Sequence, residues 1–436
     1  MKKTTTHTVT IDRIIGGGQA IGTLENGKKA LIWGGLPGEI VKFYVTKKKP
    51  SFVEGIVTSI TNPSSERITP LDPESYLSTS PWQIMDFEAE QHYKAALVEE
   101  AFELHSIVLP DPIDMYSDGV TSHYRNKVEF SWFGDVNPAT EAETLDLAFF
   151  RRGSKGKIVV ESCSLLPEPI MQLALEIRDL LHAHDISARV LKTLLIRCNR
   201  TGDCVWQLYV KDEQAAETVA EIDFSSIDAQ GGEVIYSDPR SPASRISRRI
   251  TQFGDVTLSD TILGVPFRYA TEGFFQVNIP VYEQTLKDME PWVDAEKASG
   301  VIDLYSGVGS IGLTIGGDSA TLVEVNEDAV REMRTNIIAL GSSARAVLAP
   351  SEKALDYIQA GSTVIVDPPR AGMHRDVIDR LLEVAPPRII YLSCNPVTQA
   401  RDVALLSDRY GIRHHRGYNF FPRTPHIEHL VVLDIK

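Results

Sequence analysis

The sequence of 436 residues predicts an α/β protein in three parts: a small β-barrel, a middle α+β domain and a C-terminal Rossmann-like domain. Two patterns lead to this prediction. In the last part, near-continuous apolar strands alternate with helical segments, which is typical of a parallel sheet covered on both faces. Near the N-terminus, short strands with period-two alternation are separated by glycine turns. We expect the boundaries at 1–60, 61–265 and 266–436.

The first part favours a small antiparallel barrel, because its strands are joined by turns such as Asn26-Gly27. It is also basic, with nine Lys or Arg against four Asp or Glu in the first 60 residues. The whole chain has a formal net charge of −15, which argues against a whole-surface attraction to nucleic acid. A local basic face remains compatible with such a partner, because the position of the charge matters. The alternative is an ordinary solvated face.

The middle part mixes helix and strand signals. The polar stretch TNPSSERITPLDPES marks a boundary after the barrel. A helical pattern follows in FEAEQHYKAALVEEAFELH, and strands are expected at KVEFSWF, LDLAFFR, KTLLIRC and CVWQLYV. The turn RRGSKGK is basic and carries glycines. These signals predict an α+β domain.

Several classes of protein are disfavoured. No run of about 18 apolar residues is present, so we expect no membrane span. The start, MKKTTTHTVT, has no apolar stretch behind its lysines and is a poor signal peptide. Four cysteines in a chain of this length do not make a disulfide framework. We therefore expect a reducing, cytoplasmic setting.

The stretch VIDLYSGVGSIGL, residues 301–313, is the first motif that indicates chemistry. A strand ends near Asp303, and Gly307 and Gly309 follow before a helix. Glycines let the backbone approach a ligand at the carboxyl end of a strand. The next strand ends at Glu324, where a carboxylate can hold ribose hydroxyls. The pattern suits a nucleoside-type cofactor, and a tight turn without a ligand is the alternative.

Two further strands end in reactive residues. VIVDPPR places Asp367 before two prolines, which fix a stiff extended turn. IIYLSCNPVT places Cys394 just before an expected helix start, where a helix N-terminus favours the thiolate. A simple strand terminator and a buried apolar cysteine are the alternatives.

Two weaker motifs complete the set. FPRTPHIEHL carries Glu428 near the start of the final apolar strand, and His426 and His429 flank it without a zinc-like spacing. EGFFQVNIP precedes the Rossmann-like domain, with Gln276 and Asn278 alternating with apolar residues. A surface acid and an ordinary strand or cap are the alternatives for these two.

Taken in order, FFQVN, DLYSGVG, VIVDPPR, SCNP and FP-x-T-x-H-x-E resemble the RNA uridine C5-methyltransferase family. The match covers the last 165 residues well, and YRNKVEF also looks like a family segment. The basic N-terminal part resembles the TRAM-like barrel that binds RNA in many members. The resemblance implies a class I methyltransferase domain, S-adenosylmethionine as cofactor and RNA as partner.

The resemblance also implies roles for single residues. Cys394 looks like the nucleophile and Glu428 like the base that removes a proton from carbon 5. The positions that look like cofactor contacts are Gln276, Tyr305, Ser310, Glu324 and Asp367. The residue types suit the chemistry, because a thiolate adding at C6 makes C5 nucleophilic and a carboxylate then takes the C5 proton. No metal is needed.

The sequence departs from the family at the iron–sulfur site. Many members hold a cluster on four cysteines, three of them near the stretch that here is PESYLSTSPWQ, without a cysteine. Cys163 matches the remaining position alone, and one thiolate cannot hold a cluster that needs four. We therefore expect no iron–sulfur cluster and no metal. APSEKAL, residues 349–355, and Arg423 also differ from the residues usual in the family.

Other readings remain open at this point. One is a methyltransferase acting on a base nitrogen or a protein amide, and another is a non-catalytic RNA-binding protein with a methyltransferase fold. The N-terminal barrel favours large-subunit ribosomal RNA (23S rRNA) as substrate, with transfer RNA as the alternative. We expect a monomer.

Overall fold

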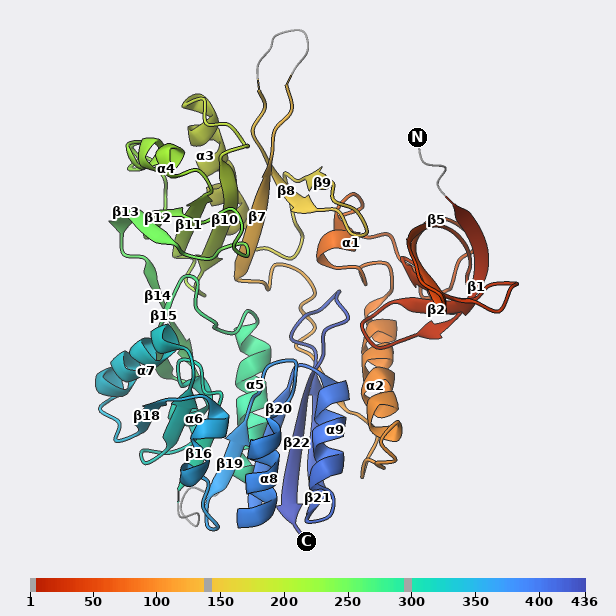
Figure 1. The fold of residues 1–436 in the computed structure, drawn as a ribbon, viewed down its shortest axis with the longest axis vertical. Helices are drawn as coiled ribbons and strands as arrows, with labels where there is room; N and C mark the ends of the chain where they lie inside the picture. The colour runs from red at the N-terminus through yellow and green to blue at the C-terminus, as the bar shows by residue number, and fades with distance from the viewer. Residues whose placement is uncertain (1–4, 137–142, 294–299) are drawn as a thin grey trace. The chain divides into compact units, whose positions relative to one another are not determined.

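The computed structural model describes residues 5–136, 143–293 and 300–436, which cluster into two compact units. Unit 1 comprises Met1–Glu90, Val120–Leu258 and Pro422–Pro425. Unit 2 comprises Gln91–Gly119, Ser259–Phe421 and His426–Lys436. Each unit is described by itself below (Figure 1).

The predicted N-terminal barrel is confirmed, but it is not wholly antiparallel, because β3 and β5 pair in parallel. Five strands close in the order β1-β2-β3-β5-β4. They are β1 (Thr6–Ile14), β2 (Ala20–Thr23), β3 (Lys29–Trp33), β4 (Ile40–Lys48) and β5 (Phe52–Asn62). Buried Ile11, Ile32 and Phe43 fill the interior. Gly55 is required where β5 crosses the core, because an added Cβ there would lie 2.3 Å from the Phe43 ring.

The rest of unit 1 is built on a seven-stranded sheet in the order β13-β12-β11-β10-β7-β8-β9. Its strands are β7 (Lys127–Phe133), β8 (Asp146–Phe150), β9 (Lys157–Val159), β10 (Leu191–Cys198), β11 (Cys204–Val210), β12 (Gly231–Tyr236) and β13 (Arg248–Gly254). The helices of this part are α1 (Tyr76–Thr79), α3 (Glu168–Ala183) and α4 (Glu213–Ala220). Apolar residues of α3 and α4 pack on one face of the sheet, in a core with Trp206 and Phe130.

The cysteines of unit 1 lie in buried positions. Cys198 and Cys204 face each other across β10 and β11 and form a disulfide. Cys163 is a free thiol in the core of this sheet, and burial raises its pKa to about 11.

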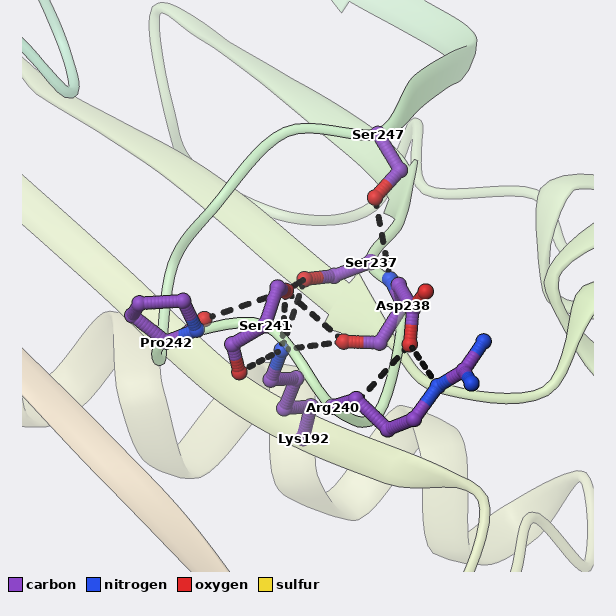
Figure 2. A network of polar contacts seen from close by, with 7 residues as sticks. All are labelled: Lys192, Ser237, Asp238, Arg240, Ser241, Pro242 and Ser247. Carbon is purple, nitrogen blue, oxygen red and sulfur yellow. Dashed lines mark hydrogen bonds and ion pairs between the residues drawn. The ribbon is translucent and has the colours of Figure 1, made fainter.

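The loop between β12 and β13 is fixed by Lys192 on β10. The Nζ of Lys192 lies within hydrogen-bonding distance of Ser237 Oγ at 2.9 Å, Asp238 O at 2.8 Å, Ser241 O at 3.1 Å and Ser241 Oγ at 3.0 Å, as Figure 2 shows. One ammonium group therefore satisfies several oxygens of a loop that has no ladder of its own.

A buried polar junction joins the segment after the barrel to the loop before α3. The Nε2 of Gln83 donates to Asp72 Oδ2 at 2.9 Å, Ser80 Oγ at 2.6 Å and Ser164 Oγ at 3.0 Å. The Asp72 carboxylate accepts from the backbone amide of Ser164 at 3.0 Å and from its hydroxyl at 2.6 Å. The junction lies in the stretch PESYLSTSPWQ and beside Cys163, where the family resemblance raised the question of a cluster.

Unit 2 is built on an eight-stranded sheet in the order β18-β17-β16-β19-β20-β22-β21-β6. Its strands are β6 (Met115–Tyr116), β16 (Val301–Leu304), β17 (Thr321–Glu324), β18 (Arg345–Leu348), β19 (Thr363–Val366), β20 (Arg388–Ser393), β21 (Tyr410–Tyr418) and β22 (Glu428–Ile435). Strands β16 to β20 are parallel, and β22 runs antiparallel to β20. The predicted Rossmann-like sheet is thus confirmed.

Helices cover the sheet of unit 2, with α8 and α9 side by side in Figure 1. The helices are α5 (Ile279–Met289), α6 (Ser310–Ile315), α7 (Glu327–Leu340), α8 (Arg375–Val384) and α9 (Pro396–Leu406), with the short 3₁₀ turns Glu290–Trp292, Ser351–Lys353 and Leu355–Tyr357. Helix α2 (Phe87–Glu103) and the hairpin of β14 (Thr257–Ile262) and β15 (Val265–Ala270) lie where the chain passes between units. None of the helices in the described ranges has the length and apolarity to cross a bilayer.

The buried junction gives a test of the fold. We expect Gln83→Leu to lower the free energy of unfolding by about 2–4 kcal/mol, because it leaves the buried oxygens of Asp72, Ser80 and Ser164 with fewer donors. Urea denaturation measures this difference. The matched control is Gln214→Leu on the exposed face of α4, which should change the value by less than about 0.5 kcal/mol. Equal effects of the two variants would contradict the structural role of the junction.

Candidate active site

The carboxyl ends of the parallel strands gather the sequence-predicted residues at one edge of the unit 2 sheet. Tyr305 follows directly after β16, Asp367 after β19 and Cys394 after β20. Glu428 reaches the same edge for a different reason. Strand β22 is antiparallel, so its first residue, not its last, lies there, and Ser393 pairs with His429. The next position along this register sets Cys394 beside Glu428.

A small cavity that is open to solvent lies at this edge. Its wall includes four of the predicted cofactor contacts, namely Gln276, Tyr305, Ser310 and Asp367. The rest of the wall is formed by Phe274, Phe275, Tyr282, Ser306, Gly307, Val308 and Ile311. A mostly apolar wall with a few polar groups is typical of a small-molecule site.

The glycine loop between β16 and α6 bends with left-handed backbone angles. Tyr305 has φ of 64°, Gly307 of 57° and Gly309 of 88°. A tyrosine in this region is strained by roughly 1–3 kcal/mol, and such strain persists where the surroundings enforce it. Glu324 does not line the cavity. Its carboxylate accepts from the backbone amides of Gly307 at 2.9 Å and Asn326 at 2.8 Å, so it orders the loop.

Several buried polar groups lie behind the loop. Asp303 accepts from the amide of Gly312 at 2.9 Å, and burial raises its pKa to about 8. The Oγ of Ser306 in the cavity wall is buried and has no partner among the described residues. Tyr282 meets Ser310 hydroxyl to hydroxyl at 2.8 Å. Burial raises the pKa of Tyr282, so its phenol stays neutral.

Cys394 is a half-buried thiol in a negative environment. Burial raises its pKa to about 12, and the charges of Glu428 and Asp367 add to this, while Arg370 opposes it. We expected the start of α9 to favour the thiolate, but burial and the two carboxyl groups outweigh that effect in the free protein. Burial also raises the pKa of Glu428 well above its ordinary value and that of Asp367 to about 7. Arg370 is the cation that faces this cluster.

Side chains of α9 hold the loop that carries Arg370. Asn395 Nδ2 and Thr398 Oγ1 donate to Arg370 O at 2.8 and 3.1 Å. Arg401 donates to Ala371 O at 2.9 Å, and Asp402 accepts from the amide of Met373 at 2.8 Å. The loop is therefore fixed to the helix that follows Cys394.

The same helix also holds the strand that carries Glu428. Gln399 is fully buried, and its Nε2 donates to Tyr391 O at 3.0 Å and His429 O at 2.9 Å. Its Oε1 lies 2.7 Å from His429 Nδ1, which must therefore carry the proton. Burial lowers the pKa of His429 well below its ordinary value, so the ring is neutral. His429 is thus a structural residue.

The remaining singled-out residues lie near the site without joining the cavity wall. Asn278 precedes α5 and donates to Phe420 O at 3.2 Å. His426 lies 3.5 Å from Arg370 Nη2. In the described part of the chain, no cluster of three or more His, Cys, Asp or Glu side chains is arranged to hold a metal ion.

Comparisons with known proteins show which proteins this chain resembles. Residues 352–436 match the model of the tRNA (uracil-5-)-methyltransferase family. An uncharacterized RNA methyltransferase of Nitratidesulfovibrio vulgaris is 28% identical, over 98% of this chain and 96% of its own, and one of Porphyromonas gingivalis is 28% identical over 91% and 93%. The chain is therefore similar in sequence to RNA methyltransferases along nearly its whole length.

A solved structure shares the fold of this methyltransferase. It is the Pyrococcus abyssi tRNA (uracil-54, C5)-methyltransferase in complex with S-adenosyl-L-homocysteine. The TM-score is 0.76 at 19% identity, and the match covers 98% of this chain and 100% of that one.

Sequence reasoning did not assign two residues of the methyltransferase site. Arg370 follows the Asp-Pro-Pro turn, and only its place beside Cys394 and Glu428 identifies it. Tyr282 lies within the helical segment IPVYEQ, and nothing in that segment distinguishes it from a core tyrosine. Both could have been found only by asking which side chains meet at the sheet edge.

The raised pKa of Asp303 predicts a pH dependence of stability. Its native pKa of about 8 exceeds the unfolded value near 3.8, so the native state binds more protons between these limits and loses stability as the pH rises through them. Asp303→Asn removes this effect. We expect the stability of the variant relative to wild type to increase from pH 5 to pH 8 in urea denaturation. Asp379→Asn on the exposed face of α8 is the control and should show a constant difference. A constant difference for Asp303→Asn too would refute the shift.

Proposed function

We propose that this protein methylates carbon 5 of a uracil in RNA, with S-adenosylmethionine as methyl donor, Cys394 as nucleophile and Glu428 as base. The observation that supports this best is the register of β20 and β22, because it sets a thiol beside a carboxyl group at the edge where the cavity lies. One soft nucleophile and one carboxylate are the groups that the reaction needs.

The cavity suits the proposed cofactor. Gln276, Tyr305, Ser310 and Asp367 would hold it from the wall, and the unpartnered Ser306 Oγ offers a further polar contact. Glu324, at the end of β17 beside the loop, accepts three backbone amides and keeps one lone pair for a ribose hydroxyl. When bound, the cofactor supplies an electrophilic methyl group on a sulfonium ion.

The residues of the chain then act in turn on the uracil. The Cys394 thiolate forms a bond to C6, and the electron pair of the C5–C6 double bond moves toward C5 and O4. C5 would form a bond to the methyl group of the donor, and the electron pair of the broken S–CH₃ bond would stay on sulfur, which leaves a neutral thioether. The carboxylate of Glu428 removes the C5 proton, and the pair left behind re-forms the double bond and expels the thiolate. Neither residue is consumed.

The protonated thiol must first be activated. In the free protein, Arg370 is the group that lowers the pKa of Cys394, and burial with two carboxyl groups raises it. A sulfonium cation next to Asp367 would add a second positive charge and favour the thiolate. The target base must also leave its stack to reach Cys394.

The RNA substrate is the finer part of the proposal. We favour large-subunit ribosomal RNA, because the N-terminal barrel and the middle domain offer RNA-binding surface beyond a single base. Transfer RNA is the second candidate, favoured by the fold shared with an enzyme that is named for a tRNA uracil. The proposal includes domains at 1–60, 61–265 and 266–436, action as a monomer, and a cytoplasmic location.

The nucleophile and the base can be separated by two variants. With methyl-labelled S-adenosylmethionine and unmodified transcripts of ribosomal and transfer RNA, we expect the wild type to label 5-methyluridine. Cys394→Ala should abolish this label by at least about 10³-fold while binding the cofactor normally, because no other thiol reaches C6. Glu428→Gln should accumulate a covalent protein–RNA complex that is visible on a denaturing gel, because the C5 proton stays in place.

Matched controls are Cys163→Ala, which removes a buried thiol of unit 1, and Glu327→Gln on the exposed start of α7. Normal turnover by Glu428→Gln without a trapped complex would show that Glu428 is not the base. Label in a nucleoside other than 5-methyluridine would overturn the proposed reaction.

The activation of the thiol gives an independent test. At pH 7, iodoacetamide should modify Cys394 about 10-fold faster with S-adenosylmethionine bound than with S-adenosylhomocysteine, because only the former carries the sulfonium charge. Mass spectrometry of the peptide with Cys394 gives the rate, in a Cys163→Ala background. Equal rates with both ligands would exclude activation by the cofactor charge.

A further inference from the structure

The basic turn 151–157 takes no part in the proposed chemistry. It joins β8 to β9 at the edge of the seven-stranded sheet in unit 1. Arg151 and Lys155 are both exposed, and neither side chain has a partner among the residues that the structure describes. Two uncompensated cations on one short turn form a local positive patch in a chain with a net charge of −15.

An exposed aromatic ring lies at the base of this turn. Phe150 is 63% exposed. Lys157 pairs with it across β8 and β9, and the Lys157 Nζ lies 5.5 Å from the ring centroid. The same ammonium donates to Trp132 O, which keeps it in place. A large apolar ring left in solvent between cations is the arrangement that proteins use as a stacking platform for nucleic-acid bases.

The turn is packed against the barrel of the same unit. The guanidinium of Arg152 lies 4.1 Å over the ring of Trp33 and donates to Leu77 O. Gly153 has φ of 73°, and a Cβ there would lie 2.8 Å from Thr46 Cγ2, so no other residue fits so close to β4. Figure 1 shows β8 and β9 next to α1 in unit 1.

The contact at Thr46 brings further lysines next to the turn. Lys48 and Lys49 follow at the end of β4, are exposed, and have no side-chain partner in the described part of the chain. Lys47 forms a 2.8 Å ion pair with Glu54, so the nearby acid is already compensated. The turn and the strand end thus form one positive surface.

We infer that Lys48, Lys49, Phe150, Arg151 and Lys155 form a binding surface for single-stranded RNA, the hairpin–barrel surface. Phosphates contact the four cations, and one unpaired base stacks on Phe150. All five residues belong to unit 1, whereas the cavity residues and Cys394 belong to unit 2.

The chemistry of the surface favours this partner over two others. A duplex keeps its bases stacked on each other and leaves none free for Phe150. An acidic protein segment would pair with the cations but would gain little from the ring. A strand whose target base is flipped out is unpaired nearby, and it offers both phosphates and a base. The inference rests on the proposed function only in taking RNA as the partner.

The test uses the full chain and a probe that cannot react at Cys394. Fluorescein-labelled oligoadenylate of about 12 nucleotides contains no uracil, and its binding is followed by fluorescence anisotropy across a range of KCl concentrations. Arg151→Ala with Lys155→Ala should reduce the slope of log Kobs against log [KCl] by about 1.4, since each phosphate contact contributes about 0.7 with single strands. Phe150→Ala should weaken binding about 10-fold with the slope unchanged, and Phe150→Trp should restore it.

The control is Arg334→Ala with Arg413→Ala, which removes two exposed cations from unit 2 and should leave the slope unchanged. An equal slope in the two double variants would overturn the surface. Oligoadenylate affinity that is unchanged in Phe150→Ala would overturn the stacking contact. So would an RNA duplex that binds more tightly than oligoadenylate and with the same affinity in wild type and Phe150→Ala. Competition by polyglutamate as strong as that by polyadenylate would indicate an acidic protein partner instead.

These outcomes are independent of the methyl transfer. Oligoadenylate binding through the surface without formation of 5-methyluridine in any RNA would contradict the proposed function alone. Formation of 5-methyluridine with oligoadenylate binding unaffected by the variants would contradict the surface alone.

Discussion

Helix α9 begins two residues after Cys394, and its side chains hold both segments that face that cysteine. On one side, Asn395, Thr398 and Asp402 fix the loop that carries Arg370. On the other, the fully buried Gln399 makes two hydrogen bonds to His429, in the strand that begins at Glu428, and one to Tyr391 of β20. A buried amide that lost one of these partners would cost about 1–3 kcal/mol, so the arrangement is strongly determined. The relative positions of thiol, acid and guanidinium all depend on this one helix.

The direction of β22 explains how the acid and the thiol meet. In a parallel sheet, residues at strand starts lie at the opposite edge from residues at strand ends. Because β22 is antiparallel to β20, its start lies next to the end of β20. Two residues separated by 34 positions in the sequence are thereby brought to one edge without any special loop. Burial raises the pKa of both groups, and the charge of Glu428 raises that of Cys394 further.

Much of this site could be predicted from the sequence, because strand ends in a parallel sheet share an edge. Asp367 and Cys394 both follow apolar strands, and on that ground alone both could be expected at the sheet edge where the cavity lies. Glu324 ends a strand in the same way, yet its carboxylate serves the backbone of the glycine loop, a choice that depends on distances of a few ångströms. The positions of Arg370 and Tyr282 in the site could not be predicted, because the residue type alone does not determine the direction of a side chain. The junction of Asp72, Gln83 and Ser164 joins segments 81 or more positions apart, and no local pattern reports such a pairing.

The packing of Arg152 over Trp33 bears on how the proposed surface would bind RNA. Because the barrel and the β8–β9 turn are already fixed to each other within unit 1, the hairpin–barrel surface exists before any ligand arrives. The conformational entropy of bringing the barrel and the turn together is lost during folding, so it does not weaken the binding of a ligand. Such a preorganised surface favours fast encounter with a polyanion over slow mutual adjustment. Arg152 touches no phosphate in this arrangement, yet its loss would act on RNA affinity by letting the two halves of the surface separate.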